Sequence, residues 1–171
     1  RRTYERALGL ADVIGDRQSA ALVKYNISEI LIDQGRCDEA EPLIREALAI
    51  RMKKLPAGHP GIANVRTGLA LALSKLGRFA EAEEQLLAAE ASLRKAQGVP
   101  PGHYQGLLKR LVDLYAEWHA AESGKGYDAK AAEWRAKLAE WQTTTQPDEG
   151  KTEPPAASRP AATQPDERRG V

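Results

Sequence analysis

The residues that could do chemistry are few in this chain, and their spacing fits no catalytic or metal site. The histidines are His59, His103 and His119. His59 and His103 fall in equivalent loops of an internal repeat, so their recurrence follows from the repeat itself. No histidine or cysteine has the spacing of a zinc ligand set. Residues 124–126, Gly-Lys-Gly, lack both the glycine spacing and the preceding strand of a phosphate-binding loop.

The carboxylates and the single cysteine give no better case for catalysis. Glu83 and Glu84 are adjacent, so their side chains diverge on a helix, and solvated surface explains them better than acid–base work. Cys37 stands at the turn into a helix, where the second copy of the repeat has Phe79. We interpret it as a small buried hydrophobe, because a reactive thiol needs a nearby cation and partial exposure, which Arg36 alone does not establish. The sequence therefore predicts no enzymatic activity, no metal and no cofactor.

Composition excludes further classes of function. The 171 residues include 25 Lys and Arg against 24 Asp and Glu, which gives a net charge of +1. Nucleic-acid binders usually show a basic excess or stripe, and residues that could stack on bases are scarce, with aromatics at 5%. The longest apolar run, residues 69–73, is far too short to span a bilayer. We expect no nucleic-acid binding and no membrane contact by this segment, and a cytoplasmic location.

An internal sequence repeat determines the architecture of this chain and therefore the surface it presents. The pattern of residues 35–48 recurs 42 positions later in residues 77–90. A fixed period of this length is typical of stacked helical hairpins, in which each unit buries its apolar face against its neighbours. Such an array presents a curved surface rather than a closed catalytic pocket. The matching pairs are Gly35 with Gly77, Ala40 with Ala82, Glu41 with Glu83, and Ala47 with Ala89.

Apolar residues at helical spacing predict two complete hairpins and a degenerate third. The large aromatics Trp134 and Trp141 in the third unit fit a terminal cap that closes the core. Helices are expected over about 38–55, 62–76, 79–97, 104–121 and 127–142, besides a first helix that includes residues 23–31. The expected segments are 1–15 (second helix of a truncated preceding repeat), 16–60 and 61–102 (complete units), 103–142 (degenerate unit and cap) and 143–171 (tail).

Two details concern the helix expected from about residue 38. Asp38 is predicted to cap it, because a short polar side chain can accept a hydrogen bond from the first turn. Pro42 is predicted at the edge of that first turn, where a missing N–H costs least. The proline and glycine clusters at residues 56–61 and 98–103 are expected to be loops that close the two units.

Both ends of the chain depart from the complete units. Residues 1–14 match the phase of a second helix whose partner is absent, so we expect this chain to be the C-terminal part of a longer protein. This unpaired helix is expected to expose Tyr4, Leu8 and Leu10 and to favour self-association. Residues 143–171 hold five of the ten prolines and no aromatic, Leu or Ile, so we expect disorder there.

The tail contains one short motif twice. The sequence Thr-Gln-Pro-Asp-Glu at residues 145–149 recurs at residues 163–167. Low-complexity drift explains the repetition simply. The alternative is a duplicated linear motif that a partner recognises.

These patterns resemble tetratricopeptide repeats, and among them the kinesin-light-chain-like form with a 42-residue period. The resemblance covers about residues 1–141, and the third unit departs from it because it lacks the glycine and alanine spacing. The residues that carry it are Ser28 and Ala70 in the first helices, Gly35 and Gly77, Ala40-Glu41 and Ala82-Glu83, Ile44 and Leu86, and Ala47 and Ala89.

The resemblance implies a right-handed α-solenoid of antiparallel helix hairpins, in which the first helix of each hairpin lines a concave groove. It implies a protein–protein interaction module that binds a protein or peptide partner there without catalysis of its own. Asn26 falls where the family often has an asparagine that binds a peptide backbone, and Gly68 stands at that position in the second unit. The implied groove residues are Tyr25, Asn26, Glu29, Asp33, Thr67, Leu71, Lys75, Lys109 and Asp113.

An alternative function follows from the closing segments, residues 111–118 and 132–138. They are similar to the ends of large bacterial repeat proteins, some of which carry an amino-terminal eukaryotic-like serine/threonine kinase domain. The chain would then be the scaffolding tail of such a kinase. A glycine-rich loop, a strand lysine and His-Arg-Asp and Asp-Phe-Gly motifs upstream of Arg1 would support this alternative.

Overall fold

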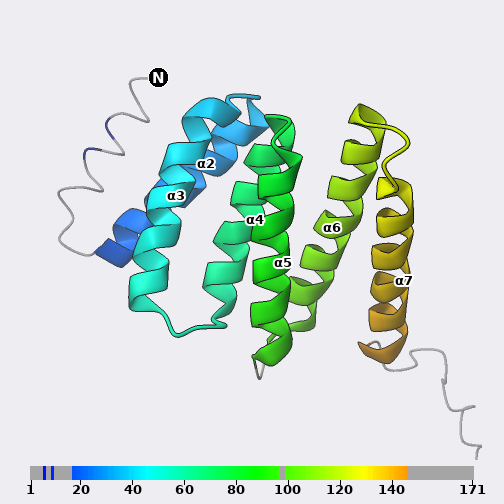
Figure 1. Ribbon diagram of the computed structural model, residues 1–171. Coiled ribbons are helices and arrows are strands. Elements are labelled where there is room, and N and C mark those ends of the chain that lie inside the picture. The colour runs from blue at the N-terminus through cyan, green and yellow to red at the C-terminus, as the bar shows by residue number, and fades with distance from the viewer. Residues whose placement is uncertain (1–5, 7–8, 10–16, 97–98, 146–171) are drawn as a thin grey trace, which may run out of the picture.

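The structure, a computed structural model, describes residues 6, 9, 17–96 and 99–145, which form helical hairpins side by side in chain order (Figure 1). These residues contain no strand, so the predicted all-α solenoid is confirmed for them. The expected helix over residues 1–14 and the tail from residue 146 onward lie almost wholly outside the described residues. The elements are α2 (Arg17–Asp33), α3 (Cys37–Lys54), α4 (Pro60–Lys75), α5 (Phe79–Lys95), α6 (Pro101–Ala121) and α7 (Tyr127–Thr145).

The turns inside the first two hairpins are built alike. Gly35 and Gly77 both have a φ of 75°, a left-handed conformation that glycine adopts without steric cost. The next N–H reaches back to close each helix: Arg36 donates to the carbonyl of Leu31 at 2.8 Å, and Arg78 to that of Leu73 at 2.9 Å. The repeated glycine thus fixes the same reversal of direction twice.

The helix after the first turn begins earlier than expected, and two predictions about it are wrong. α3 starts at Cys37, so Asp38 lies inside its first turn and Arg36 precedes it, with no side-chain capping bond. The Arg36 guanidinium instead donates to both carboxylate oxygens of Glu39 at 2.7 Å. Because the helix starts earlier, Pro42 lies in its interior rather than at the edge of the first turn.

Cys37 itself is buried, with 4% of its surface exposed, which confirms the interpretation as a small core residue. Burial raises the pKa of the Cys37 thiol, so the thiolate form is disfavoured. The structure gives this cysteine a packing role.

Two helices begin at a proline, a few residues before their predicted starts. α4 begins at Pro60 and α6 at Pro101, because proline suits a first helical position whose N–H would have no partner. His59 precedes α4, and its Nδ1 accepts a hydrogen bond from the Gly61 N–H at 2.9 Å. At the other end, α7 continues to Thr145, three residues into the segment assigned to the tail.

Small residues lie where the helices approach most closely. Ala40, Ala47, Ala82 and Ala89 are all 0% exposed, as the repeat pattern predicted. Leu73, Leu86 and Leu111, with at most 1% exposure, fill the spaces between successive hairpins. Larger side chains at the alanine positions would force the helices apart.

Two equivalent glutamates tie each hairpin to the next. Glu41 on α3 accepts hydrogen bonds from Arg45 at 2.8 Å and from Arg78 of the second hairpin at 2.7 Å. Glu83 on α5 accepts from the Tyr115 hydroxyl and from Lys130, at 3.0 Å, both in the third hairpin. Glu83 is therefore a connecting residue, and its interpretation as plain solvated surface was wrong.

Replacing Glu41 by Gln is expected to destabilise the protein at pH 7 and to have a smaller effect at pH 3. Burial tends to raise the pKa of Glu41, but the hydrogen bonds and charges of Arg45 and Arg78 outweigh it and hold that pKa below its usual range. A carboxyl with a lowered folded-state pKa adds stability at neutral pH, and this is lost as the pH falls through the folded value. Urea denaturation at the two pH values measures the difference.

The matched control is Glu84→Gln, which removes an exposed carboxylate from α5 at the position after Glu83. It should change the free energy of unfolding little at either pH. A Glu41→Gln effect of equal size at pH 7 and pH 3 would show that the charge of Glu41 contributes nothing.

Candidate functional site

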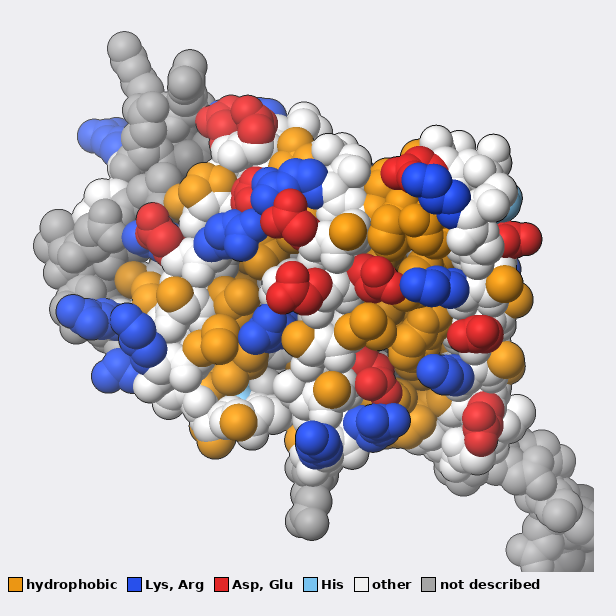
Figure 2. Space-filling model, viewed as in Figure 1, with side chains coloured by type: hydrophobic (Ala, Val, Ile, Leu, Met, Phe, Trp, Pro, Cys, Tyr) orange, Lys and Arg blue, Asp and Glu red, His pale blue; other side chains and the backbone are white. Residues whose placement is uncertain are grey.

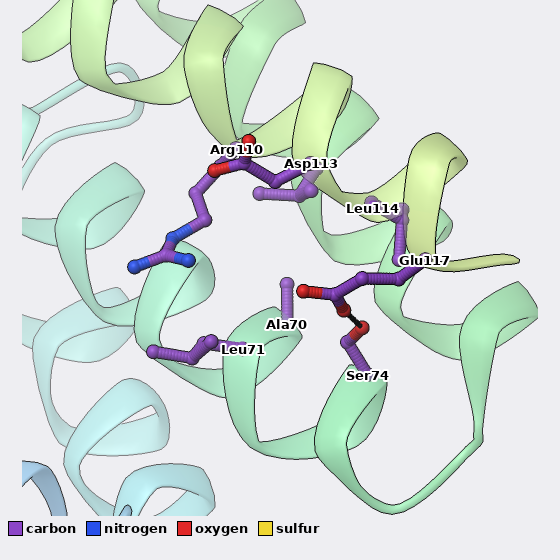
Figure 3. A pocket seen from close by; sticks show the side chains of 8 residues that line it. Ala70, Leu71, Ser74, Arg110, Asp113, Leu114 and Glu117 are labelled. Carbon is purple, nitrogen blue, oxygen red and sulfur yellow. Dashed lines mark hydrogen bonds between the residues drawn. The ribbon is translucent and has the colours of Figure 1, made fainter. Parts of the chain in front are cut away.

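The first helices of the three hairpins form one continuous face, because α4 packs against both α2 and α6. Two hollows, of about 480 and 450 Å³, lie along this face, the first between α2 and α4 and the second between α4 and α6. A third, much smaller hollow lies between α4 and α6 (Figure 3). We call these three hollows together the groove.

The α2 side of the groove is acidic and its centre is mixed. Glu29 and Asp33 on α2 face Thr67 and Leu71 on α4 across the larger hollow. Glu29 and Asp33 are both exposed, whereas Thr67 and Leu71 are half-buried. These four residues were predicted as groove residues, and the structure places them around one hollow.

Tyr25 also lines this hollow, but as part of its floor. Only 6% of its surface is exposed, and its hydroxyl donates to the Asn64 carbonyl at 3.5 Å. The ring lies over Gly68, where a Cβ would come within 2.9 Å of the ring and hydroxyl atoms. Burial, with Glu29 nearby, raises the pKa of Tyr25 well above its ordinary value, so the hydroxyl stays neutral. Gly68 thus makes room for a tyrosine that joins α2 to α4.

Arg110 on α6 lines all three hollows and was missed by the sequence analysis. Figure 3 shows its guanidinium extending into the hollow beside Leu71 and away from the Asp113 carboxylate. Among the described residues, no hydrogen bond or ion pair holds this guanidinium. A half-buried cation with five N–H donors therefore stands ready at the centre of the groove.

The α6 side adds two carboxylates. Asp113, which was predicted, and Glu117, which was not, line the small hollow with Arg110. Glu117 accepts a hydrogen bond from the hydroxyl of Ser74 on α4, which links the two helices across the groove (Figure 3). The groove therefore carries four carboxylates, on Glu29, Asp33, Asp113 and Glu117, around one guanidinium.

Three predicted groove residues are not among those that line the hollows. Asn26 on α2, Lys75 on α4 and Lys109 on α6 are all exposed. Lys75 lies near the end of α4, where its charge acts on the Cys37 thiol. The sequence did contain the signal for Arg110, because adding the 42-residue period to Asn26 gives Gly68 and then Arg110.

Other kinds of site find no support in the part of the chain that the structure describes. There, His, Cys, Asp and Glu side chains nowhere gather in a group of three or more that could hold a metal ion. None of the helices described has the length and apolar character needed to cross a membrane.

Comparison with known proteins agrees with this geometry. The tetratricopeptide repeat family matches residues 18–95, which span α2 to α5. Two crystal structures of a Podosopora anserina kinesin-light-chain-type protein with nearly identical TPR-like repeats, one a point variant, superpose on 84% and 85% of this chain. Their TM-scores are 0.65 and 0.64 at 21% sequence identity, and the chain spans 66% of the length of each.

No curated protein matches the chain. The family match covers the first two hairpins, and the superposition extends the same fold over the third. Residues 18–95 therefore match the tetratricopeptide repeat family, and the fold of the chain is similar to that of kinesin-light-chain-type repeats.

Proposed function

We propose that this chain is a protein-interaction scaffold whose groove binds an extended segment of a partner protein, and that this segment carries basic side chains. Tetratricopeptide arrays are folds for protein interaction, and a helical array offers an open surface rather than an enclosed reaction site. Beyond this general role, we locate the binding site in the groove and expect its ligand to be basic.

The observation that carries the proposal is the position of Arg110. Its guanidinium lies in the groove without a partner among the described residues, and its N–H groups can donate to a carbonyl oxygen of a ligand. A main-chain carbonyl of an extended peptide supplies such an oxygen. Arg110 would therefore fix the register of the peptide at the middle of the groove.

The four carboxylates around Arg110 set the preferred charge of the ligand. Glu29 and Asp33 line one side, and Asp113 and Glu117 line the other. Complementary charges steer association and penalise wrong partners. Lysine or arginine side chains on either side of the peptide unit held by Arg110 meet these carboxylates.

The proposed groove has few aromatic anchors, so its affinity comes from several polar contacts. Tyr25 is the aromatic residue among those lining the three hollows, and it is mostly buried. Aromatic and arginine side chains dominate most binding energies, so a single hairpin of this kind binds weakly. Contacts to three hairpins at once raise the affinity through multivalency.

Selection of peptides from a random library on the full chain tests the proposal directly. We expect the selected peptides to be rich in Lys and Arg, and their Kd to be measurable by isothermal calorimetry. In the triple variant Glu29→Ala, Asp33→Ala and Arg110→Ala we expect binding to weaken at least about tenfold. A hydrogen bond to a charged group contributes about 1.5–3 kcal/mol, and about 1.4 kcal/mol corresponds to a factor of ten.

Tyr25 stays unchanged in this experiment, because truncating a ring packed between α2 and α4 would disturb the fold. The control variant, Glu84→Ala with Arg94→Ala, removes exposed charges of both signs from α5 outside the groove. It should bind the selected peptides like the unchanged protein. Selection of acidic peptides, or equal affinities in both variants, would contradict the proposal.

A further inference from the structure

The scarce aromatic residues of this chain are concentrated in one place. The sequence contains one Phe, three Trp and five Tyr, and seven of these nine residues lie where α5, α6 and α7 meet. We call these seven residues the aromatic seam. They are Phe79 on α5, Tyr104, Tyr115 and Trp118 on α6, and Tyr127, Trp134 and Trp141 on α7.

Ring contacts lie near both ends of α6. Near its C-terminal end, the Trp118 ring centroid lies 4.1 Å from that of Tyr127 and 5.8 Å from that of Phe79. Near its N-terminal end, the Tyr104 ring centroid lies 4.6 Å from that of Trp141. The seam therefore joins α6 to α7 near both ends of α6, and joins α5 to α6 near the C-terminal end of α6.

The seam is only partly covered by protein. Figure 2 shows hydrophobic side chains in a continuous band over α6, between α5 and α7. Within the described residues the backbones of α5 and α7 do not approach closely, although the Lys130–Glu83 ion pair links the two helices. Phe79, Tyr104, Tyr127 and Trp141 are all half-buried. Continuous apolar surface of this kind marks an interaction site.

The chain outside the described structure begins next to this surface. α7 ends at Thr145, about one turn beyond Trp141, and residues 146–171 follow. The prolines of these 26 residues are Pro147, Pro154, Pro155, Pro160 and Pro165. Proline-rich segments dock on aromatic-lined grooves at a low cost in entropy, because proline already fixes the backbone angle φ.

The length of this segment suffices for docking. Extended at about 3.1 Å per residue, 26 residues reach about 80 Å, whereas the seam is about as long as α7, roughly 30 Å. Because the segment is attached to the surface, its effective concentration is of millimolar order, so even a weak contact is substantially occupied.

The charges along the seam match the repeated motif of the segment. Gln-Pro-Asp-Glu occurs at residues 146–149 and again at 164–167, so a proline precedes two carboxylates each time. On the α7 side of the seam, the Lys137 ammonium lies 3.8 Å from the Trp134 ring centroid, one helical turn before Trp141. A proline on the Trp141 ring would bring its carboxylates to this lysine.

We propose that residues 146–171 fold back onto the aromatic seam of the same chain, with prolines against the half-buried rings of Tyr104 and Trp141. The site is separate from the groove, which lies on α2, α4 and α6. In this proposal the duplicated Gln-Pro-Asp-Glu motif binds within its own chain.

The test uses the full chain with Cys37→Ala and Ala157→Cys, so that a nitroxide label can be attached in the middle of the segment. The only three tryptophans of the chain all belong to the seam, and each gives one indole N–H signal in a nitrogen-15 spectrum. We expect the label to reduce the intensity of the Trp141 signal by about half or more, in proportion to the docked fraction.

A matched variant keeps the label and the length of the segment but replaces its five prolines by Ala. We expect it to restore the Trp141 intensity, whereas unchanged broadening would overturn the role of proline. A second sample mixes labelled chain without nitrogen-15 and unlabelled chain with nitrogen-15. Broadening in this mixture would assign the contact to a second copy, and absence of broadening in every sample would exclude docking; either result overturns the proposal.

Discussion

Leu86→Ala is expected to lower the free energy of unfolding by about 3 kcal/mol, whereas Leu87→Ala beside it should lower it by less than about 1 kcal/mol. Leu86 is 1% exposed and lies on α5 against the first helices of the second and third hairpins. Leu87 points outward and is 38% exposed. Truncation of the first leaves a cavity between hairpins, and truncation of the second leaves none.

Urea denaturation followed by circular dichroism measures both variants. The slope of the transition should stay unchanged, because neither substitution alters the surface exposed on unfolding much. Equal losses at the two positions would mean that the helical faces are assigned incorrectly. The same two leucines thus test the phase of α5 directly.

The second large effect is expected at Trp118, where replacement by Ala should cost about 3–5 kcal/mol. The side chain is 8% exposed and packs against the rings of Phe79, Tyr115 and Tyr127, which belong to three different helices. Its indole N–H also donates to Glu122 at 3.3 Å. Removal of the ring takes away the stacked contact with Phe79 that joins the second hairpin to the third.

Hydrogen exchange by residue locates this loss. Repeat arrays are stabilised by each unit and by the contacts between neighbouring units, so α6 and α7 should lose protection before α2 and α3 do. Trp118→Phe serves as the control, because it keeps a stacked ring and loses only size and the bond to Glu122. Uniform loss of protection in Trp118→Ala would mean that the hairpins unfold as one unit.

The fold was predictable because a few residues of the repeat determine it almost alone. Gly35 and Gly77 need a left-handed backbone, and the alanines at 40 and 82 need close helix contact, so the period was visible as identical residues 42 positions apart. The exact start of each helix was harder to predict. Asp38 is a residue type that often caps helices, yet after the glycine turn the helix already begins at Cys37.

The groove was predictable in part. The predicted residues that line it are Tyr25, Glu29, Asp33, Thr67, Leu71 and Asp113. Arg110 was missed because the equivalent position of the second hairpin is Gly68, so no polar residue pointed to the same position in the third. The burial of Tyr25 could not be anticipated, since it depends on the space that Gly68 leaves on another helix. The aromatic seam was missed for a similar reason. Its residues are far apart in sequence and meet only because α5, α6 and α7 converge.

Glu41 and Glu83 each link one hairpin to the next, and α7 lacks the equivalent glutamate. Each of these two glutamates follows a buried alanine and bonds to the next hairpin, so both ties run from one hairpin to its successor. α7 has the buried alanine, Ala131, but the exposed residue after it is Ala132, which has no carboxylate. A further hairpin appended after α7 would lack this fastening, and Ala132→Glu is the substitution from which a longer designed array would have to start.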